Sequence, residues 1–249
     1  MATSPSYAPR GAAAPAVRVA YGAMPAALAA PAALAGATMG TTWSARLALP
    51  AGCSDQAARL AVQAALDEVV AQMSTWEAGS DISLFNQAGA GWRELPDAFF
   101  HVLRHAMALA EDSDGAYDPT VGPLVNAWGF GPHQRAFEPP SPAAVEAARR
   151  RCGWRRVALD AGRQAALQPG GVYLDLSSIA KGYGVDRAAM ALDALGITQY
   201  LVEVGGELRA RGKRPDGQPW RVAVEVPDAS DAHALALPLE DRSIATSGD

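Results

Sequence analysis

Cysteine is almost absent from this chain of 249 residues, in which only Cys53 and Cys152 occur. Two cysteines so far apart have neither the spacing of a metal site nor that of a disulfide framework, so we interpret both as small buried or half-buried side chains. The four histidines are dispersed as well. His101 and His105 stand four residues apart on a predicted helix, but no carboxylate accompanies them at zinc-protease spacing. We therefore interpret them as ordinary surface or core side chains.

A run of one charge sign is also lacking. The chain has 21 Lys and Arg residues against 26 Asp and Glu residues, a formal net charge of −5, and the basic residues are scattered. Without a basic stripe, a nucleic-acid partner is not expected. Anionic cofactors are not excluded, because local donors bind them whatever the net charge. Hydrophobic residues at 49% and charged residues at 19% are typical of a globular chain that buries a substantial core.

No long uninterrupted hydrophobic run is present either. Residues 1–37 are rich in Ala and Pro, and two prolines break the apolar run over 23–37. This segment is too short and too broken for a transmembrane helix and is a poor match to a signal peptide. We expect residues 1–37 to be a disordered leader, with a degenerate export signal as the alternative, and residues 38–249 to form one domain. Without a convincing signal peptide, a cytoplasmic location is slightly favoured.

Hydrophobic periodicity predicts helices mixed with hairpins, which is an α+β fold. Residues 74–86 are expected to be irregular, and residues 114–131 to form a long loop. The predicted elements are a strand over 42–49, a helix from Ser54 or Asp55 to about Met73, a helix beginning at Pro96, a short helix from Ser141-Pro142, a hairpin over 156–168, a helix over 178–195, and strands over 199–204, from 207, over 220–226 and over 243–246. The two apolar helix stripes are Val62, Leu66, Val69 and Met73, and then Phe99, Leu103, Ala106 and Ala110.

The most informative stretch is the junction that begins at Asp175. A predicted strand ends at this carboxylate, hydroxyl residues that include Ser178 follow, and Lys181 stands in the first helical turn. A helix start carries unpaired N–H groups and partial positive charge, so with a lysine it is suited to phosphate. Asp175 would be repelled by that phosphate unless a divalent cation lay between them, or unless it held a nucleotide hydroxyl or amine. The spacing matches neither a P-loop nor a dinucleotide fingerprint.

Two weaker motifs lie in the first third of the chain. Gly40 permits close backbone approach and Met39 offers a soft apolar contact, although a strand entry with a packing methionine would have the same sequence. Trp76 has a side chain that can stack on a flat ring or fill the core under a loop, and the sequence does not separate these two roles.

Two further motifs lie later in the chain. In the predicted loop over 114–131, Tyr117 offers a ring and a hydroxyl and Asp118 offers two acceptors. Long loops of this kind are often functional, with a purely structural loop as the alternative. Gly205 and Gly206 lie between two predicted strands, where they form either a plain hairpin turn or a close approach to a ligand.

Taken together, these segments resemble the FAD:protein FMN transferase family, also called ApbE proteins. The resemblance runs from Met39 to the last residue, in the family's order. It rests mainly on four stretches, which are residues 116–124, residues 175–183, residues 205–207 and the closing Thr246-Ser247-Gly248-Asp249.

The resemblance implies a T-fold-like mixed α/β domain with largely antiparallel sheets, bound FAD and Mg²⁺. It also implies that FMN is moved from FAD to a Thr or Ser hydroxyl of an acceptor protein, with release of AMP. Asp175 and Lys181 would act in catalysis, and Ser178 would give the metal an oxygen through its backbone carbonyl. The residues expected to contact FAD are Met39, Trp76, Ala116, Tyr117, Asp118, Asp175, Lys181, Gly205 and Gly206.

Two alternatives and one departure accompany this hypothesis. The chain could store or deliver FAD without chemistry, or it could hydrolyse FAD to FMN and AMP. The family pattern continues beyond Asp249 with a histidine segment and an Asp/Thr pair that complete the metal shell. We therefore expect the C-terminal part of the domain to be missing and the chain to be impaired. By family habit, the site of action would be the periplasmic side of the inner membrane.

Overall fold

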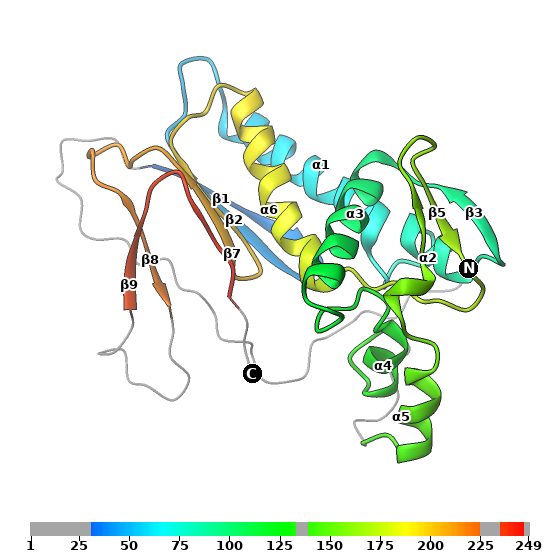
Figure 1. Ribbon diagram of the computed structural model, residues 1–249. Coiled ribbons are helices and arrows are strands. Elements are labelled where there is room, and N and C mark those ends of the chain that lie inside the picture. The colour runs from blue at the N-terminus through cyan, green and yellow to red at the C-terminus, as the bar shows by residue number, and fades with distance from the viewer. Residues whose placement is uncertain (1–30, 133–138, 225–234, 247–249) are drawn as a thin grey trace, which may run out of the picture.

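The computed structural model describes residues 31–132, 139–224 and 235–246 (Figure 1). In chain order the elements are β1 (Ala32–Thr38), β2 (Thr41–Leu47), α1 (Asp55–Met73), α2 (Asp81–Gln87), β3 (Gly91–Glu94), α3 (Asp97–Asp112), α4 (Gly122–Ala127), α5 (Pro142–Arg149), a 3-10 turn (Trp154–Arg156), β4 (Leu159–Asp160), β5 (Ala165–Gln168), α6 (Ser177–Ala194), β6 (Tyr200–Val204), β7 (Glu207–Arg211), β8 (Trp220–Val224), β9 (Leu235–Leu239) and β10 (Ser243–Ile244).

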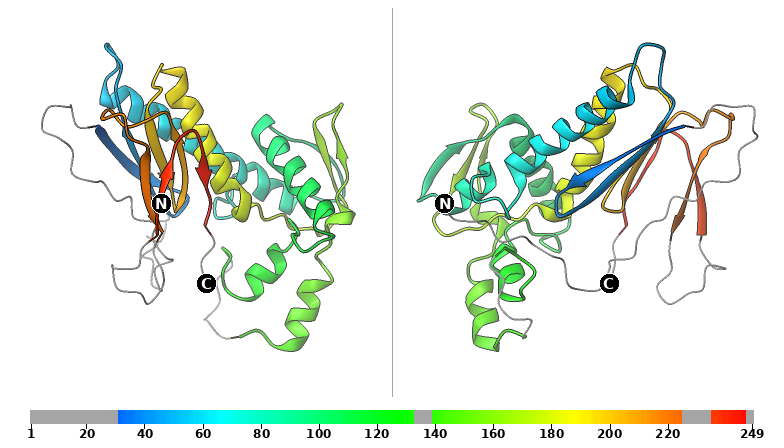
Figure 2. Two further views of the ribbon diagram at one scale, coloured as in Figure 1. Left: turned by 60° about the vertical axis from the view of Figure 1, so that its left-hand side comes forward. Right: turned by 180° about the vertical axis from the view of Figure 1, so that it is seen from behind.

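The main sheet has five antiparallel strands in the order β1-β2-β6-β7-β10. Helices α1 and α6 cover one face, and the β8–β9 hairpin lies on the other side (Figures 1 and 2). Because side chains alternate along a strand, Tyr200, Val202 and Val204 of β6 pack in the cluster beneath the helices, whereas Leu201 packs with Trp220 of β8. The sheet is thus a middle layer with a hydrophobic core on each face.

Ion pairs join α6 to β7 along their length. The strand contributes one glutamate and two arginines, and the helix contributes one lysine and two aspartates, so each pair has opposite charges. Side chains alternate along a strand, so the three charged residues of β7 point toward the helix, on the face opposite the buried Leu208 and Ala210. The pairs are Lys181 with Glu207, Asp186 with Arg209, and Asp193 with Arg211.

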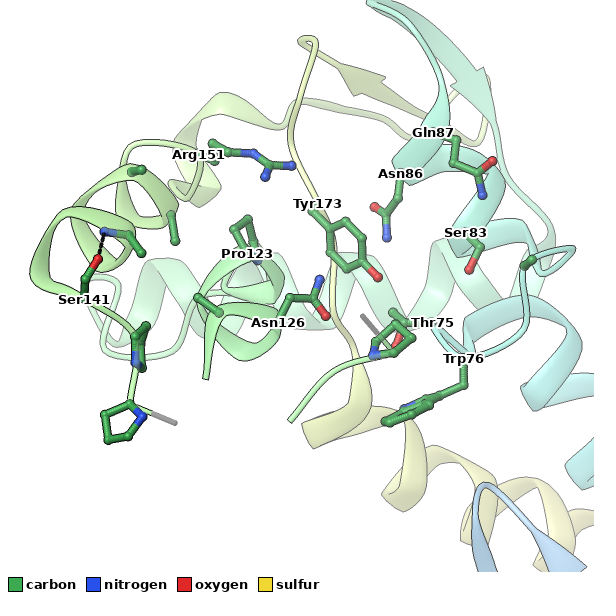
Figure 3. A pocket seen from close by; sticks show the side chains of 18 residues that line it. Thr75, Trp76, Ser83, Asn86, Gln87, Pro123, Asn126, Ser141, Arg151 and Tyr173 are labelled. Carbon is green, nitrogen blue, oxygen red and sulfur yellow. Dashed lines mark hydrogen bonds between the residues drawn. The ribbon is translucent and has the colours of Figure 1, made fainter. Parts of the chain in front are cut away.

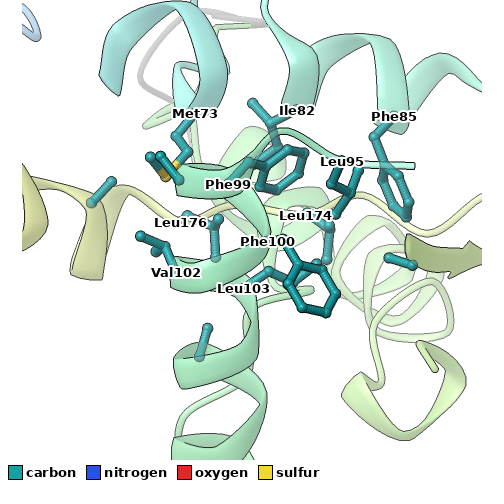
Figure 4. Packing of buried hydrophobic residues seen from close by; sticks show 14 of the residues in the cluster. Met73, Ile82, Phe85, Leu95, Phe99, Phe100, Val102, Leu103, Leu174 and Leu176 are labelled. Carbon is teal, nitrogen blue, oxygen red and sulfur yellow. The ribbon is translucent and has the colours of Figure 1, made fainter. Parts of the chain in front are cut away.

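A third core lies around α3, where α2 and the small β3-β5-β4 sheet close over it (Figures 1 and 4). The stripe predicted for this helix is confirmed, since Phe99, Leu103, Ala106 and Ala110 are all buried. Leu174 and Leu176 enter the same cluster from the chain segment that leads into α6. This packing fixes the start of α6 in the core around α3, while the rest of the helix packs in the core between α1 and the main sheet.

Several elements differ from expectation. Residues 32–37, expected to belong to a disordered leader, form most of β1, whereas residues 1–30 of that leader lie outside the described residues. Within 74–86, expected to be irregular, α2 begins after Ser80, whose hydroxyl accepts the Ser83 N–H at 3.2 Å. The long loop over 114–131 contains α4. Strands β3 and β9 were not anticipated.

The predicted class is confirmed, because the chain folds into mixed α and β structure with antiparallel sheets. Helix α1, with Ser54 as its N-cap, and helix α6 lie within one or two residues of their predicted bounds. Within the described part of the chain, no helix has the length and apolar character needed to cross a bilayer.

Candidate functional site

The chain approaches α6 as an extended segment that side chains hold in place. Asn86 Nδ2 donates to the Leu174 carbonyl at 2.9 Å, and Asn86 Oδ1 accepts the Leu174 N–H at 2.7 Å. Gln168 makes the same two bonds to Val172, at 3.1 and 3.2 Å. The two amides thus take the place of a neighbouring strand, so the strand predicted here is extended without belonging to a sheet.

Asp175 lies at the end of this segment, immediately before α6. Its N–H donates to the Pro119 carbonyl at 2.8 Å, and its Oδ1 accepts the Ser177 N–H at 2.9 Å. Leu176 is the N-cap residue of this helix and makes no side-chain capping bond. Among the described residues, no hydrogen bond engages Asp175 Oδ2. The carboxylate therefore caps the helix with one oxygen and keeps the other for a ligand.

Lys181 is half-exposed in the second turn of α6 and is held by a partner that the sequence did not identify. Its Nζ lies 3.2 Å from Glu207 Oε1 and 3.5 Å from the Gly205 carbonyl. Glu207 is only 8% exposed, and its Oε2 accepts the Thr246 N–H at 3.3 Å. An ammonium has three N–H groups, so Lys181 keeps a donor for an anion while Glu207 and Gly205 fix its position.

The Gly205–Gly206 turn packs directly against this lysine. Both glycines have positive φ, 54° and 97°, where other residues are strained. A Cβ built on Gly205 would lie 2.8 Å from Thr41 Cγ2 and 3.7 Å from Lys181 Cδ. The Gly206 N–H donates to Glu203 Oε1 at 2.8 Å, which secures the turn. The paired glycines thus permit the chain to pass close to Thr41 and Lys181.

Met39 comes to the same place from the turn between β1 and β2. Met39 and Gly40 have φ of 49° and 70°, as in a tight hairpin turn. A Cβ built on Gly184 of α6 would lie 2.8 Å from Met39 Cε. Glycine at 184 is therefore what allows the methionine to reach the helix. Met39, Lys181 and the Gly205–Gly206 turn are brought together around the N-terminal half of α6.

Tyr117 lies beside the start of α6, from the loop that precedes α4. Its hydroxyl is buried and has no partner within hydrogen-bonding geometry among the described residues. Burial raises the pKa of Tyr117, the charges of Asp175 and Asp118 raise it further, and the nearby Ser178 side chain lowers it. Tyr117 thus presents a neutral phenol beside Asp175 and Ser178, ready to bond a ligand.

Asp118 uses its carboxylate to shape this loop. Oδ1 accepts both the N–H and the hydroxyl of Thr120, at 2.8 and 2.6 Å, and Oδ2 accepts the Trp154 N–H at 3.3 Å. Thr120 is fully buried and accepts the Gly153 N–H at 2.7 Å. The side chain of Asp118 is therefore already engaged, and the loop offers a ligand mainly the backbone around Ala116 and the side chain of Tyr117.

Trp76 stands apart from these residues. Its side chain is 48% exposed and lines a cavity of about 990 Å³ between α2 and the α4–α5 pair (Figure 3). None of the other residues predicted to bind the cofactor lines this cavity. Tyr173, two residues before Asp175, does line it. The cavity is thus a neighbour of the cluster around α6, and we place the phosphate chemistry at α6 because the charged donors lie there.

The oxygen atoms at this junction fit a partial shell for Mg²⁺. No group of three His, Cys, Asp or Glu side chains suited to a metal occurs in the described ranges. Mg²⁺ is commonly held by one or two carboxylates together with substrate phosphates and water. Asp175 Oδ2 and the exposed Ser178 supply such a limited set. In the first turn of a helix a carbonyl points along the axis into the next turn, so the Ser178 hydroxyl is the freer of its two oxygens.

Comparison with known proteins places this cluster in a family. The ApbE family model matches residues 39–249. The FAD:protein FMN transferase of Haemophilus influenzae is 38% identical over 226 residues, and that of Vibrio cholerae is 39% identical over 220 residues. Each alignment covers 87% of this chain and 65% of the relative. The chain thus spans about two thirds of the length of these relatives.

Solved structures agree in fold. A flavin transferase ApbE from Vibrio cholerae superposes with a TM-score of 0.81 at 37% identity, over 88% of this chain and 71% of that one. The apo form of the Pseudomonas stutzeri flavinyl transferase ApbE gives 0.82 at 35% identity, over 91% and 71%. Sequence and fold match over the segments that carry the cluster at α6, and the chain therefore belongs to the ApbE family.

Proposed function

We propose that this protein transfers FMN from FAD to a Thr or Ser hydroxyl of an acceptor protein, with release of AMP and with Mg²⁺ as cofactor. The observation that carries the proposal is the convergence of two distant turns, at Met39 and at Gly205–Gly206, on the start of α6 beside Lys181. The matched Haemophilus and Vibrio proteins bear the name of this activity.

Each residue of the cluster has a role in this proposal. The partial positive charge at the start of α6 and the Lys181 ammonium bind the diphosphate of FAD. The Gly205–Gly206 turn lets the backbone approach it, and Met39 gives an apolar contact. Tyr117 donates its hydroxyl to a cofactor oxygen, because its raised pKa keeps the proton in place. Trp76 packs beside the flavin ring.

The reaction exchanges the phosphoanhydride bond of FAD for a phosphate ester bond to the acceptor. The acceptor oxygen bonds to the phosphorus of the FMN half, the bond to the AMP phosphate breaks, and the acceptor hydroxyl loses its proton. Phosphoryl transfer of this kind depends on positioning and charge neutralisation. Lys181, fixed by Glu207, offsets charge on the diphosphate. Mg²⁺ held by Asp175 and Ser178 would neutralise charge on the same phosphates when bound.

Equilibrium binding tests the diphosphate assignment. The chain is titrated with FAD, FMN and riboflavin, and flavin fluorescence is followed. We expect FAD to bind at least about tenfold more tightly than riboflavin, since a charged donor is typically worth about 1.5–3 kcal/mol. Lys181→Ala should remove most of that difference. Equal affinities for FAD and riboflavin in the parent chain would refute the assignment.

Transfer is tested separately with a library of ten-residue peptides that have a central threonine, with alanine at that position in the control library. With FAD and Mg²⁺ we expect covalent flavin on the threonine peptides alone, matched by AMP in equal amount. Tight FAD binding without AMP would instead identify a storage protein. AMP release that does not depend on the peptides would identify a hydrolase.

A further inference from the structure

The cavity beside Trp76 has an unusual charge pattern. Its volume is about 990 Å³, and Arg151 is the only charged residue among the described residues that line it. No carboxylate occurs in this described part of the lining, although the whole chain has a formal net charge of −5. The remaining lining consists of amides, hydroxyls, prolines, alanines and the two rings of Trp76 and Tyr173 (Figure 3). The cavity is therefore suited to a neutral or acidic occupant with many polar groups.

The cavity adjoins the reacting end of the proposed site. Tyr173 and Asp175 stand two residues apart on the extended segment, so their side chains project on the same side, about 7 Å apart along the chain. The Tyr173 ring is held against α4, because a Cβ built on Gly122 would lie 2.1 Å from Tyr173 Cδ1.

A transfer reaction needs room for two substrates. The residues assigned to FAD account for the donor, and of these only Trp76 lines the cavity. The cavity stands at the upper end of the range for small-molecule pockets, about 300–1,000 Å³. Its amide and hydroxyl side chains can pair with the N–H and C=O groups of a polypeptide. The second substrate is therefore the occupant that its size, chemistry and position suit.

We propose that the cavity receives an extended segment of the acceptor polypeptide, with an acidic side chain on Arg151 and the reactive hydroxyl directed past Tyr173 toward Asp175. This inference rests on the proposed transferase function. The charge of the lining selects the segment, since Arg151 has no carboxylate partner among the described residues. Tyr173, which lines the cavity two residues before Asp175, gives the segment its direction.

Two pairs of variants test the proposal. Ala147 of α5 lines the cavity, whereas the equally exposed Ala143 of the same helix does not, so Ala147→Trp fills the space and Ala143→Trp is its control. Arg151→Ala removes the charge, and Arg149→Ala removes a neighbouring arginine that lies outside the cavity. The immobilised chain, with FAD and Mg²⁺, is exposed to the central-threonine peptide library, and the retained peptides are sequenced. FAD affinity is measured in parallel.

We expect the parent chain to retain peptides enriched in Asp and Glu relative to the input. Ala147→Trp should reduce retention at least fivefold, and Arg151→Ala should abolish the acidic enrichment, while FAD affinity stays within twofold and both controls behave as the parent. Retention equal to blank resin, or retention unchanged by Ala147→Trp, would overturn the proposal. Loss of FAD affinity in Ala147→Trp with retention unchanged would show that the cavity holds flavin. Absence of FAD binding by the parent would instead count against the proposed function.

Discussion

Lys181 Nζ lies 3.2 Å from Oε1 of the buried Glu207, and this contact ties the start of α6 to the first residue of β7. The same carboxylate accepts the Thr246 N–H through its other oxygen. The buried Glu207 therefore fixes the position of the lysine, whose side chain stays partly exposed. The lysine then has two separable tasks, which are to neutralise a buried carboxylate and to bind phosphate.

Lys181→Ala is expected to lower both stability and FAD affinity. Removing the cation leaves the Glu207 carboxylate buried without it, at a cost of about 1–3 kcal/mol in the free energy of unfolding. The double variant Lys181→Ala/Glu207→Gln removes that buried charge, so urea denaturation should show stability restored. FAD affinity should stay low, because the phosphate donor is still missing. Recovery of FAD affinity in the double variant would show that Lys181 only supports the fold.

Two glycines of α6 are expected to respond differently to alanine. A Cβ on Gly182 meets nothing within 4 Å, so Gly182→Ala should stabilise the helix by about 0.5–1 kcal/mol. A Cβ on Gly184 would lie 2.8 Å from Met39 Cε and must displace that side chain. Gly184→Ala should gain less stability in thermal unfolding and should weaken FAD binding. Unchanged FAD affinity in Gly184→Ala would remove Met39 from the site.

Asn86→Ala should free the segment that leads to Asp175. Both hydrogen bonds to the buried Leu174 are lost, and its unpaired backbone groups cost about 1–3 kcal/mol in the free energy of unfolding. The neighbouring Gln87 is exposed, so Gln87→Ala serves as the matched control. We expect a lower urea midpoint and weaker FAD binding for Asn86→Ala alone. Equal behaviour of the two variants would mean that the Asn86 side chain does not position Asp175.

Tyr200→Phe is expected to reduce the alkaline loss of stability. Burial, followed by the hydrogen bond to Asp193 and its charge, raises the pKa of Tyr200. The unfolded chain releases this proton near pH 10, about the ordinary value for tyrosine, whereas the folded chain retains it. Above that pH the unfolded state binds fewer protons, so stability falls as pH rises. Urea midpoints measured from pH 8 to 11 should fall more steeply for the parent. Parallel curves would contradict this cause.

The long helices were predictable because each repeats its apolar stripe over several turns. Helices α2 and α4 have seven and six residues, which is less than two full turns, so no stripe develops. Strand β1 was missed because its alanines and glycine show no alternation, although pairing with β2 orders it. The Ala-rich composition of residues 1–31 continues into β1, so composition does not mark where the sheet begins.

For the candidate site, local motifs indicated Asp175, Lys181 and the paired glycines. They did not indicate Asn86, which lies 88 residues before its partner Leu174. A hydrogen bond between residues so far apart in the sequence cannot be predicted from a local motif. Glu207 belongs to the motif over 205–207, but its ion pair with Lys181 depends on the packing of β7 against α6, which the motif does not predict. The carboxylate of Asp118 was expected to contact the cofactor, whereas the structure engages it with Thr120 and Trp154.

The most direct measurement is a crystal structure of this chain with FAD. The account predicts that the diphosphate lies at the first two turns of α6, with an oxygen within about 4 Å of Lys181 Nζ, the distance of an ion pair. The flavin ring should lie toward Trp76, with the cavity that contains Arg151 left open. A diphosphate bound anywhere else on the chain, with Lys181 still paired only to Glu207, would contradict the account.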